Sequence, residues 1–140
     1  MAQSRHDRPG DTFQNLSAEV AYLKMTGVQT SQIPAYLEGA QGTKGWILDL
    51  RGYPPEMLAY PLGRHLVEQE TIFVRMTKCA LSNPGSFGWG DPLTLIPMKP
   101  TYQGKVVILV DETTQSRAEF HALAFRAGPN AVDEKYYSRC

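Results

Sequence analysis

The sequence predicts an α/β fold in which strands and helices alternate along the chain. Residues 106–110 form an unbroken aliphatic run, Val-Val-Ile-Leu-Val, which is typical of a strand covered on both faces in a parallel-type sheet. Apolar residues follow at Phe120, Leu123, Ala124 and Ala127 with the spacing of one helix face. Earlier segments alternate in the same manner, which indicates right-handed crossovers.

The elements expected before this pair follow from local patterns. They are strands at 20–25, 46–50 and 71–76, and helices at 31–40 and 55–69. Ser31 and Pro34 favour the start of the first helix. Pro61 and Gly63 predict that the second helix is kinked or split.

Residues 82–100 are rich in Gly and Pro, so we expect a structured loop with one short strand near 93–96. Two aromatic side chains, Phe87 and Trp89, lie in its Gly-rich part. They either line a substrate cleft or pack onto the core.

Composition narrows the function classes. The chain has 140 residues, enough for one domain with a real core, with 14 Lys and Arg against 14 Asp and Glu. This balance gives no support to a nucleic-acid or membrane-surface role. The sequence contains no run of about 18 apolar residues, so it predicts no membrane-spanning helix. The polar residues Met1 to Gly10 do not resemble a secretory signal, so the compartment stays open.

Neither cysteine nor histidine spacing predicts a metal site. The two cysteines, Cys79 and Cys140, form no CxxC motif, and the histidines at 6, 65 and 121 form no HExxH-type pair. We therefore expect no metal and no cofactor.

Ser116 has two interpretations at the sequence level. It lies in a turn between a core strand and a helix, where unpaired N–H groups and the helix dipole would stabilise an oxyanion. It also begins Ser116-Arg117-Ala118-Glu119, a pattern that fits a capping box.

The segment from Val107 to Phe120 resembles the nucleophile segment of C-terminal processing (tail-specific) and tricorn-core serine peptidases. In that family a hydrophobic strand ends in Asn/Asp-Glu, a short turn carries the serine, and Glu lies three residues later. Lys44 to Pro54 resembles the family's strand that ends in Asp-Leu-Arg. The resemblance covers roughly 12–132 and implies the Clp protease/crotonase-like spiral of strand-strand-helix units, in part.

This resemblance implies roles for individual residues. Ser116 takes the nucleophile position, Glu119 the supporting acidic position, and the Arg117 N–H one oxyanion donor. The family usually places paired glycines at the second donor, where this chain has Pro55 and Glu56. Pro55 has no N–H, so the donor would shift to the Glu56 N–H.

The general base is not identified. The processing peptidases use a lysine on a strand downstream of the serine, and tricorn-type members use a histidine from an earlier segment. Lys135 lies in a polar stretch and is interpreted as a surface residue. His121 lies about 140° around the helix from Ser116, and His65 is interpreted as a helix-surface residue.

These considerations predict three regions: a flexible N-terminal segment at 1–12, a partial peptidase catalytic domain at 13–132, and a polar tail at 133–140. Arg51 either binds a substrate carboxylate or forms a salt bridge with Asp49 or Glu112.

Three functions remain open. The first is a serine peptidase acting on a peptide or protein substrate, incomplete or inactive in this chain. The second is a non-catalytic peptide-binding module of the same fold. The third is a crotonase-like enzyme of acyl thioesters, which Pro55 disfavours because it removes an oxyanion donor.

Overall fold

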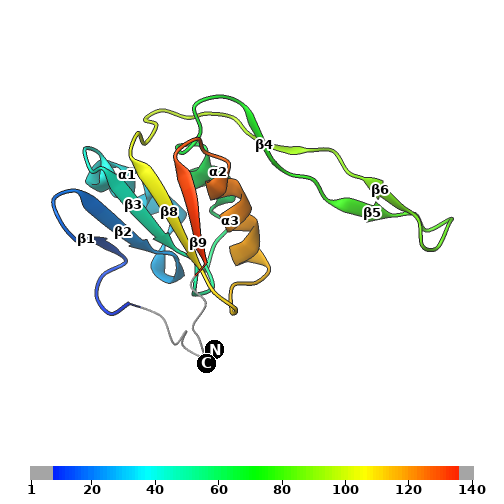
Figure 1. The fold of residues 1–140 in the computed structure, drawn as a ribbon, viewed down its shortest axis with the longest axis horizontal. Helices are drawn as coiled ribbons and strands as arrows, with labels where there is room; N and C mark the ends of the chain where they lie inside the picture. Colours follow the sequence, from blue (N-terminus) through cyan, green and yellow to red (C-terminus); the bar gives the residue numbers. More distant parts are fainter. Residues whose placement is uncertain (1–7, 136–140) are drawn as a thin grey trace.

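The computed structural model describes residues 8–135, which form a sheet-and-helix body and one long arm (Figure 1). The main sheet has the order β1-β2-β3-β8-β9. Its strands are β1 (Phe13–Asn15), β2 (Val20–Lys24), β3 (Gly45–Asp49), β8 (Lys105–Val110) and β9 (Ala131–Lys135). β1 is antiparallel to β2, and all the other neighbours are parallel. The predicted α/β class with a parallel sheet is confirmed, whereas the specific spiral stays a prediction.

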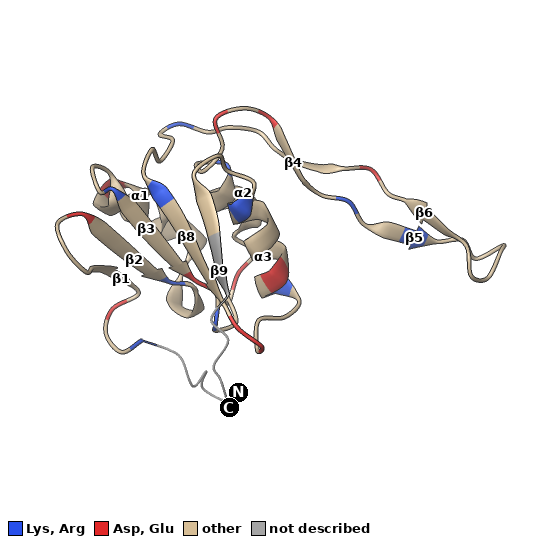
Figure 2. Cartoon of the chain, in the orientation of Figure 1, with Lys and Arg blue, Asp and Glu red and all other residues tan. Residues whose placement is uncertain are grey.

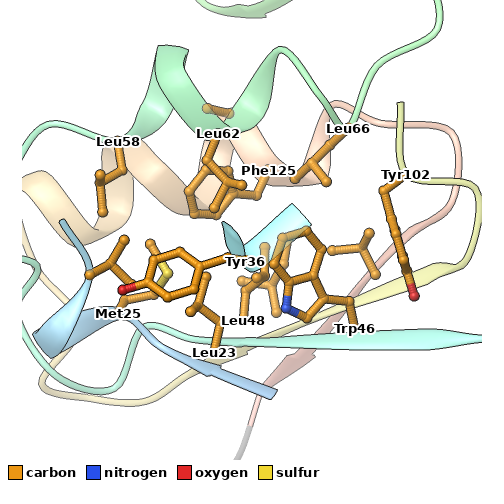
Figure 3. Packing of buried hydrophobic residues seen from close by; sticks show 14 of the residues in the cluster. Leu23, Met25, Tyr36, Trp46, Leu48, Leu58, Leu62, Leu66, Tyr102 and Phe125 are labelled. Carbon is orange, nitrogen blue, oxygen red and sulfur yellow. The ribbon is translucent and has the colours of Figure 1, made fainter. Parts of the chain in front are cut away.

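The helices pack against one face of this sheet. They are α1 (Ile33–Ala40), α2 (Ala59–Gly63) and α3 (Arg117–Arg126), with short 3₁₀ turns η1 (Met25–Gly27) and η2 (Thr30–Gln32). From β2 to β9 each parallel crossover moves the same way across the sheet, so right-handed connections place the helices on the same side. Leu48 of β3, Leu62 of α2 and Phe125 of α3 meet in the resulting core (Figure 3). No helix in the described part of the chain is long and apolar enough to cross a bilayer.

Strand β8 is covered on one face only, which corrects the expectation of burial on both. Val106 and Ile108 are buried beneath the helices, whereas Val107 and Leu109 are half-buried on the opposite face. The aliphatic run therefore hides an alternation in burial, because β-branched residues suit either face of a strand.

The prediction of a polar tail from residue 133 is wrong for residues 133–135. These residues belong to β9, which pairs with β8 in the register Val106↔Ala131 to Val110↔Lys135. The polar sequence is compatible with a strand because β9 is the edge of the sheet, where charged residues are tolerated. Residues 136–140 and the predicted flexible residues 1–7 lie outside the described residues.

The helix expected at 55–69 is reduced to α2. Pro54 and Pro55 disfavour helical backbone before it, and helical structure ends after Gly63. The chain nevertheless continues along the core, since Leu66 and Val67 are buried.

An arm of two strand pairs leaves the body after residue 70 (Figure 1). β4 (Thr71–Val74) pairs with β7 (Leu93–Leu95), and β5 (Thr77–Cys79) pairs with β6 (Phe87–Trp89), both antiparallel. The strand expected at 71–76 thus ends at residue 74, and the expected loop contains β6 as well as β7. Phe87 and Trp89 are 68% and 70% exposed, so the interpretation that they pack onto the core is wrong.

Candidate active site

The carboxyl ends of β3 and β8 lie side by side because the two strands are parallel neighbours, with Asp49 opposite Leu109. The turn after β8 bonds to the loop after β3. Thr113 Oγ1 donates to the Arg51 carbonyl at 3.0 Å, and Thr114 Oγ1 donates to the Leu50 carbonyl at 3.1 Å. We call this end of the sheet, formed by the carboxyl ends of β3 and β8, the carboxyl edge. In open α/β sheets ligands bind outside the carboxyl ends of the strands.

The turn itself is fixed by the side chain of Asp111. Its Oδ1 accepts from the Thr113 N–H at 2.8 Å and lies 2.7 Å from Thr113 Oγ1, whose single proton it shares with the Arg51 carbonyl. Thr114 Oγ1 in turn accepts from the Asp111 N–H at 3.0 Å. Such Asx-type bonds replace ladder bonds where a strand ends, so the backbone enters the next helix in a defined direction.

Ser116 has an unusual backbone conformation, with φ 54° and ψ −116°. Among the described residues it is the only non-glycine residue with positive φ. It is exposed and caps the N-terminus of α3. A serine held on a strained strand-to-helix turn presents its hydroxyl outward, as in nucleophile elbows.

Glu119 stabilises this turn. Its Oε2 accepts from the Ser116 N–H at 2.7 Å, within a capping box formed by the two residues. α3 begins at Arg117, so the Arg117 N–H belongs to the first turn, whose donors have no intrahelical acceptor. The capping interpretation of Ser116 is therefore confirmed, and it leaves the catalytic interpretation open.

The side chain of Arg117 connects the Ser116 turn to the loop after β3. Its Nη1 donates to the carbonyls of Pro54 at 3.1 Å and Pro55 at 2.7 Å. Its guanidinium also lies over the Tyr53 ring, 5.4 Å from the centroid. The loop thus offers carbonyl acceptors to Arg117.

His121 makes the second connection between α3 and this loop. Its Nε2 accepts from the Leu58 N–H at 2.8 Å, and its ring stacks on Phe125. The side chain is fully buried, and its Nδ1 has no hydrogen-bond partner among the described residues. Burial, reinforced by the charge of Arg117, lowers the pKa of His121 to about 4, so the imidazole is neutral at pH 7.

Sequence reasoning missed this role of His121. The angle of about 140° between Ser116 and His121 around the helix excludes a shared face but does not indicate what His121 contacts. The available signal was its position three residues after Ala118 and four before Phe125, which places it on the apolar face.

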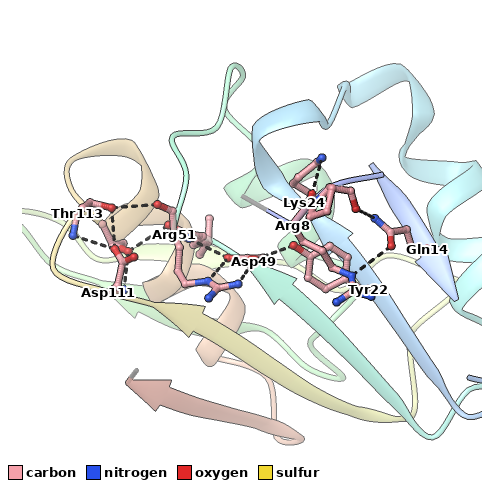
Figure 4. A network of polar contacts seen from close by, with 11 residues as sticks. Arg8, Gln14, Tyr22, Lys24, Asp49, Arg51, Asp111 and Thr113 are labelled. Atoms are coloured by element: carbon pink, nitrogen blue, oxygen red, sulfur yellow. Dashed lines mark hydrogen bonds and ion pairs between the residues drawn. The ribbon is translucent and has the colours of Figure 1, made fainter. Parts of the chain in front are cut away.

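Arg51 is held by Asp49 in a bidentate ion pair (Figure 4). The Nε and Nη2 atoms of Arg51 lie 2.9 and 2.7 Å from the two Asp49 carboxylate oxygens, and the Tyr22 hydroxyl donates to Oδ2 at 2.7 Å. The hydrogen bonds that Arg51 donates to Asp49 raise the pKa of Arg51. Of the two interpretations of Arg51, the structure contains the salt bridge with Asp49.

Glu56 also has an intramolecular partner. Its carboxylate accepts from the Thr30 N–H at 2.9 Å and from the Thr30 hydroxyl, and these bonds lower the pKa of Glu56. They fix its side chain at η2. These bonds involve only the Glu56 side chain, so the role of its backbone N–H as an oxyanion donor stays a prediction.

β9 brings a further residue to the same edge. Its last residue, Lys135, is the register partner of Val110, which precedes the Ser116 turn. Among the described residues, no group of three or more His, Cys, Asp or Glu side chains is placed to hold a metal.

The fold resembles those of peptidases. A "putative peptidase" from Parabacteroides merdae ATCC 43184 matches with a TM-score of 0.73 at 16% identity, over 86% of this chain and 41% of that one. The photosystem II D1 C-terminal processing protease matches with a TM-score of 0.58 at 16% identity, over 81% of this chain and 29% of that one. A lipoprotein from Streptococcus agalactiae matches with a TM-score of 0.53 at 18% identity, over 86% of this chain and 47% of that one. The chain spans less than half the length of each structure. No protein-family model and no curated protein matches the sequence.

Proposed function

We propose that the chain carries part of the catalytic domain of a serine peptidase related to the C-terminal processing and tricorn-like enzymes. The observation that carries this proposal is the conformation of Ser116, with positive φ at the turn between a parallel strand and a helix. Such backbone strain costs on the order of 1–3 kcal/mol and clusters at functional sites. A helix cap alone does not require it, since N-cap residues normally adopt extended backbone.

In the proposed reaction, Ser116 Oγ attacks the carbonyl carbon of a peptide bond and loses its proton to a base. The Arg117 N–H and the N-terminal dipole of α3 stabilise the tetrahedral oxyanion. The base then protonates the leaving amine, and water hydrolyses the acyl-enzyme. Glu119 acts as a positioning residue through the Ser116 N–H. The Glu56 N–H is the proposed second oxyanion donor.

Lys135 is the proposed base. The resembling processing peptidases take a lysine from a strand downstream of the serine, and β9 is the strand that follows α3 in this chain. Its parallel pairing with β8 puts the Lys135 backbone at the edge that carries Ser116. In this proposal Lys135, interpreted from the sequence as a surface residue, takes the role of the base instead.

A fluorophosphonate probe tests the nucleophile. We expect the folded chain to be labelled at Ser116, Ser116→Ala to abolish labelling, and Lys135→Met to reduce its rate by at least about 100-fold. Ser82→Ala, an exposed serine on the arm, is the matched control and keeps labelling. Labelling that persists in Ser116→Ala contradicts the assignment of the nucleophile. An unchanged rate in Lys135→Met contradicts the assignment of the base.

A peptide-binding module without turnover is the second candidate. It is favoured by Pro55, which lacks an N–H, and by the loop carbonyls that accept from Arg117. This function is selected over the first if the chain binds a peptide but neither hydrolyses it nor reacts with the fluorophosphonate probe.

A further inference from the structure

The distal part of the arm contains two strands that pack on nothing but each other. At its base, Phe73 contacts the rings of Tyr60 and Phe120, and Leu95 is fully buried. Every residue of β5 and β6, in contrast, is exposed. An isolated two-stranded hairpin is marginally stable in water, so a partner surface would stabilise it.

One face of this ribbon is uncharged and partly aromatic. The register pairs Thr77 with Trp89 and Cys79 with Phe87, and directly opposite residues point to the same face. We call these four residues the aromatic face. Lys78, paired with Gly88, lies on the other face. Exposed aromatic side chains grouped in this way mark interaction sites.

The body of the same chain does not cover the aromatic face. The arm projects away from the sheet and helices (Figure 1). Its base is tied down by bonds from the Met98 N–H to the Arg64 carbonyl and from the Tyr102 N–H to the His65 carbonyl. Tyr102 contacts Trp46 near the amino ends of β3 and β8, whereas Ser116 follows the carboxyl end of β8. The arm therefore starts at the opposite edge from the candidate active site.

Charge argues against an anionic surface as the partner. Between residues 71 and 95 the charged side chains are Arg75, Lys78 and Asp91 (Figure 2). Recognition of anionic lipid headgroups uses clusters of about 4–8 basic residues. The arm has no such cluster.

We propose that the aromatic face packs against the aromatic face of a second copy of this chain, in a two-fold symmetric dimer. A two-fold interface brings the same patch from both subunits together, so the patch must be self-complementary. An uncharged face of aromatic and small side chains meets this requirement, because no like charges oppose each other. The aromatic face contributes four residues per subunit, far fewer than the roughly 20–30 of a standard interface, so we expect a weak, concentration-dependent dimer.

Sedimentation velocity over a dilution series tests this dimer. We expect the wild type to dimerise and Phe87→Ser/Trp89→Ser to raise the dissociation constant by about 30-fold or more, as for paired interface anchors. Ile96→Ser/Met98→Ser is the matched control, since both side chains are exposed but follow β7, outside the aromatic face. A wild type that stays monomeric at all concentrations, or an aromatic variant that dimerises like the wild type, overturns the proposal.

Tryptophan fluorescence locates the contact. The chain has two tryptophans, so Trp46→Phe leaves Trp89 as the only one. We expect acrylamide to quench Trp89 less as the dimer forms, and full quenching in the dimer would overturn the proposed face.

Sedimentation with vesicles of neutral phosphatidylcholine, or of phosphatidylcholine with phosphatidylserine, distinguishes a lipid partner. Binding that is lost in Phe87→Ser/Trp89→Ser would assign the face to lipid and overturn the dimer.

Discussion

The edge that carries Ser116 and the distal arm are stabilised in different ways. At the edge, side chains of the turn after β8 and of α3 bond to the loop after β3, a segment some 60 residues earlier in the chain. In the arm, β5 pairs with β6, which lies about ten residues later, and neither contributes to the core. Tertiary contacts can therefore hold a strained residue such as Ser116, whereas β5 and β6 pair in a regular antiparallel register.

The two tryptophans provide the largest test of this difference. Trp46 is fully buried and packs edge-on against Tyr102, while Trp89 is 70% exposed on the arm. We expect Trp46→Ala to lower the free energy of unfolding by about 3–5 kcal/mol. Trp89→Ala should change it by less than about 0.5 kcal/mol in dilute solution. Urea denaturation followed by circular dichroism measures both.

The same pair of variants can break the comparison. A large loss of stability in Trp89→Ala, at a concentration where the protein is monomeric, would mean that the arm folds as part of the body.

His121 gives the next largest effect. His121→Ala removes a buried ring and leaves the Leu58 N–H without its acceptor, so we expect a loss of about 3 kcal/mol. Hydrogen exchange gives a local readout, because the Leu58 amide should lose protection more than the core strands do. His65→Ala is the matched control. His65 is buried beyond the end of α2, which corrects its interpretation as a helix-surface residue, and it bonds to the Pro100 carbonyl at the other end of the sheet. Unchanged protection at Leu58 in His121→Ala would refute the connection.

The low pKa of His121 also predicts a dependence of stability on pH. The unfolded imidazole takes up a proton below its ordinary value of 6.5, whereas the folded one resists protonation until about 4. The unfolded state therefore binds more protons in this window, and stability falls as pH falls from 6.5 to 4, by up to about 3 kcal/mol. His121→Gln has no titrating ring. Its free energy of unfolding, measured with urea at each pH, should therefore fall less steeply between pH 6.5 and pH 4 than that of the wild type. Equal slopes would contradict the prediction.

The strand-turn-helix around Ser116 could be predicted from sequence because its signals are local. The aliphatic run gives β8, and the Ser-to-Glu spacing gives the capping box that starts α3. The roles of Ser116, Glu119 and Arg117 in a reaction stay predictions. What the sequence did not reveal is the positive φ of Ser116, since the backbone angle depends on how the turn is tied to the loop after β3.

Other features were missed because they depend on distant partners. β9 contains Asp133, Glu134 and Lys135, and it forms a strand because β8 offers an open edge. His121 acquires its role from Leu58, 63 residues earlier. In the arm, a composition rich in Gly and Pro favoured a loop, while the antiparallel partners of β6 and β7 lie before that segment.

The smallest expected effect concerns the strain at Ser116 itself. Glycine adopts positive φ without steric cost, whereas alanine does not, so Ser116→Gly should be more stable than Ser116→Ala by about 1–2 kcal/mol. Both variants remove the hydroxyl and should abolish probe labelling alike. At Ser82, an exposed position of the arm without positive φ, the glycine variant should not be the more stable one. If alanine at position 116 were as stable as glycine, the turn would relax in the variant, and the edge would hold no more strain than the arm.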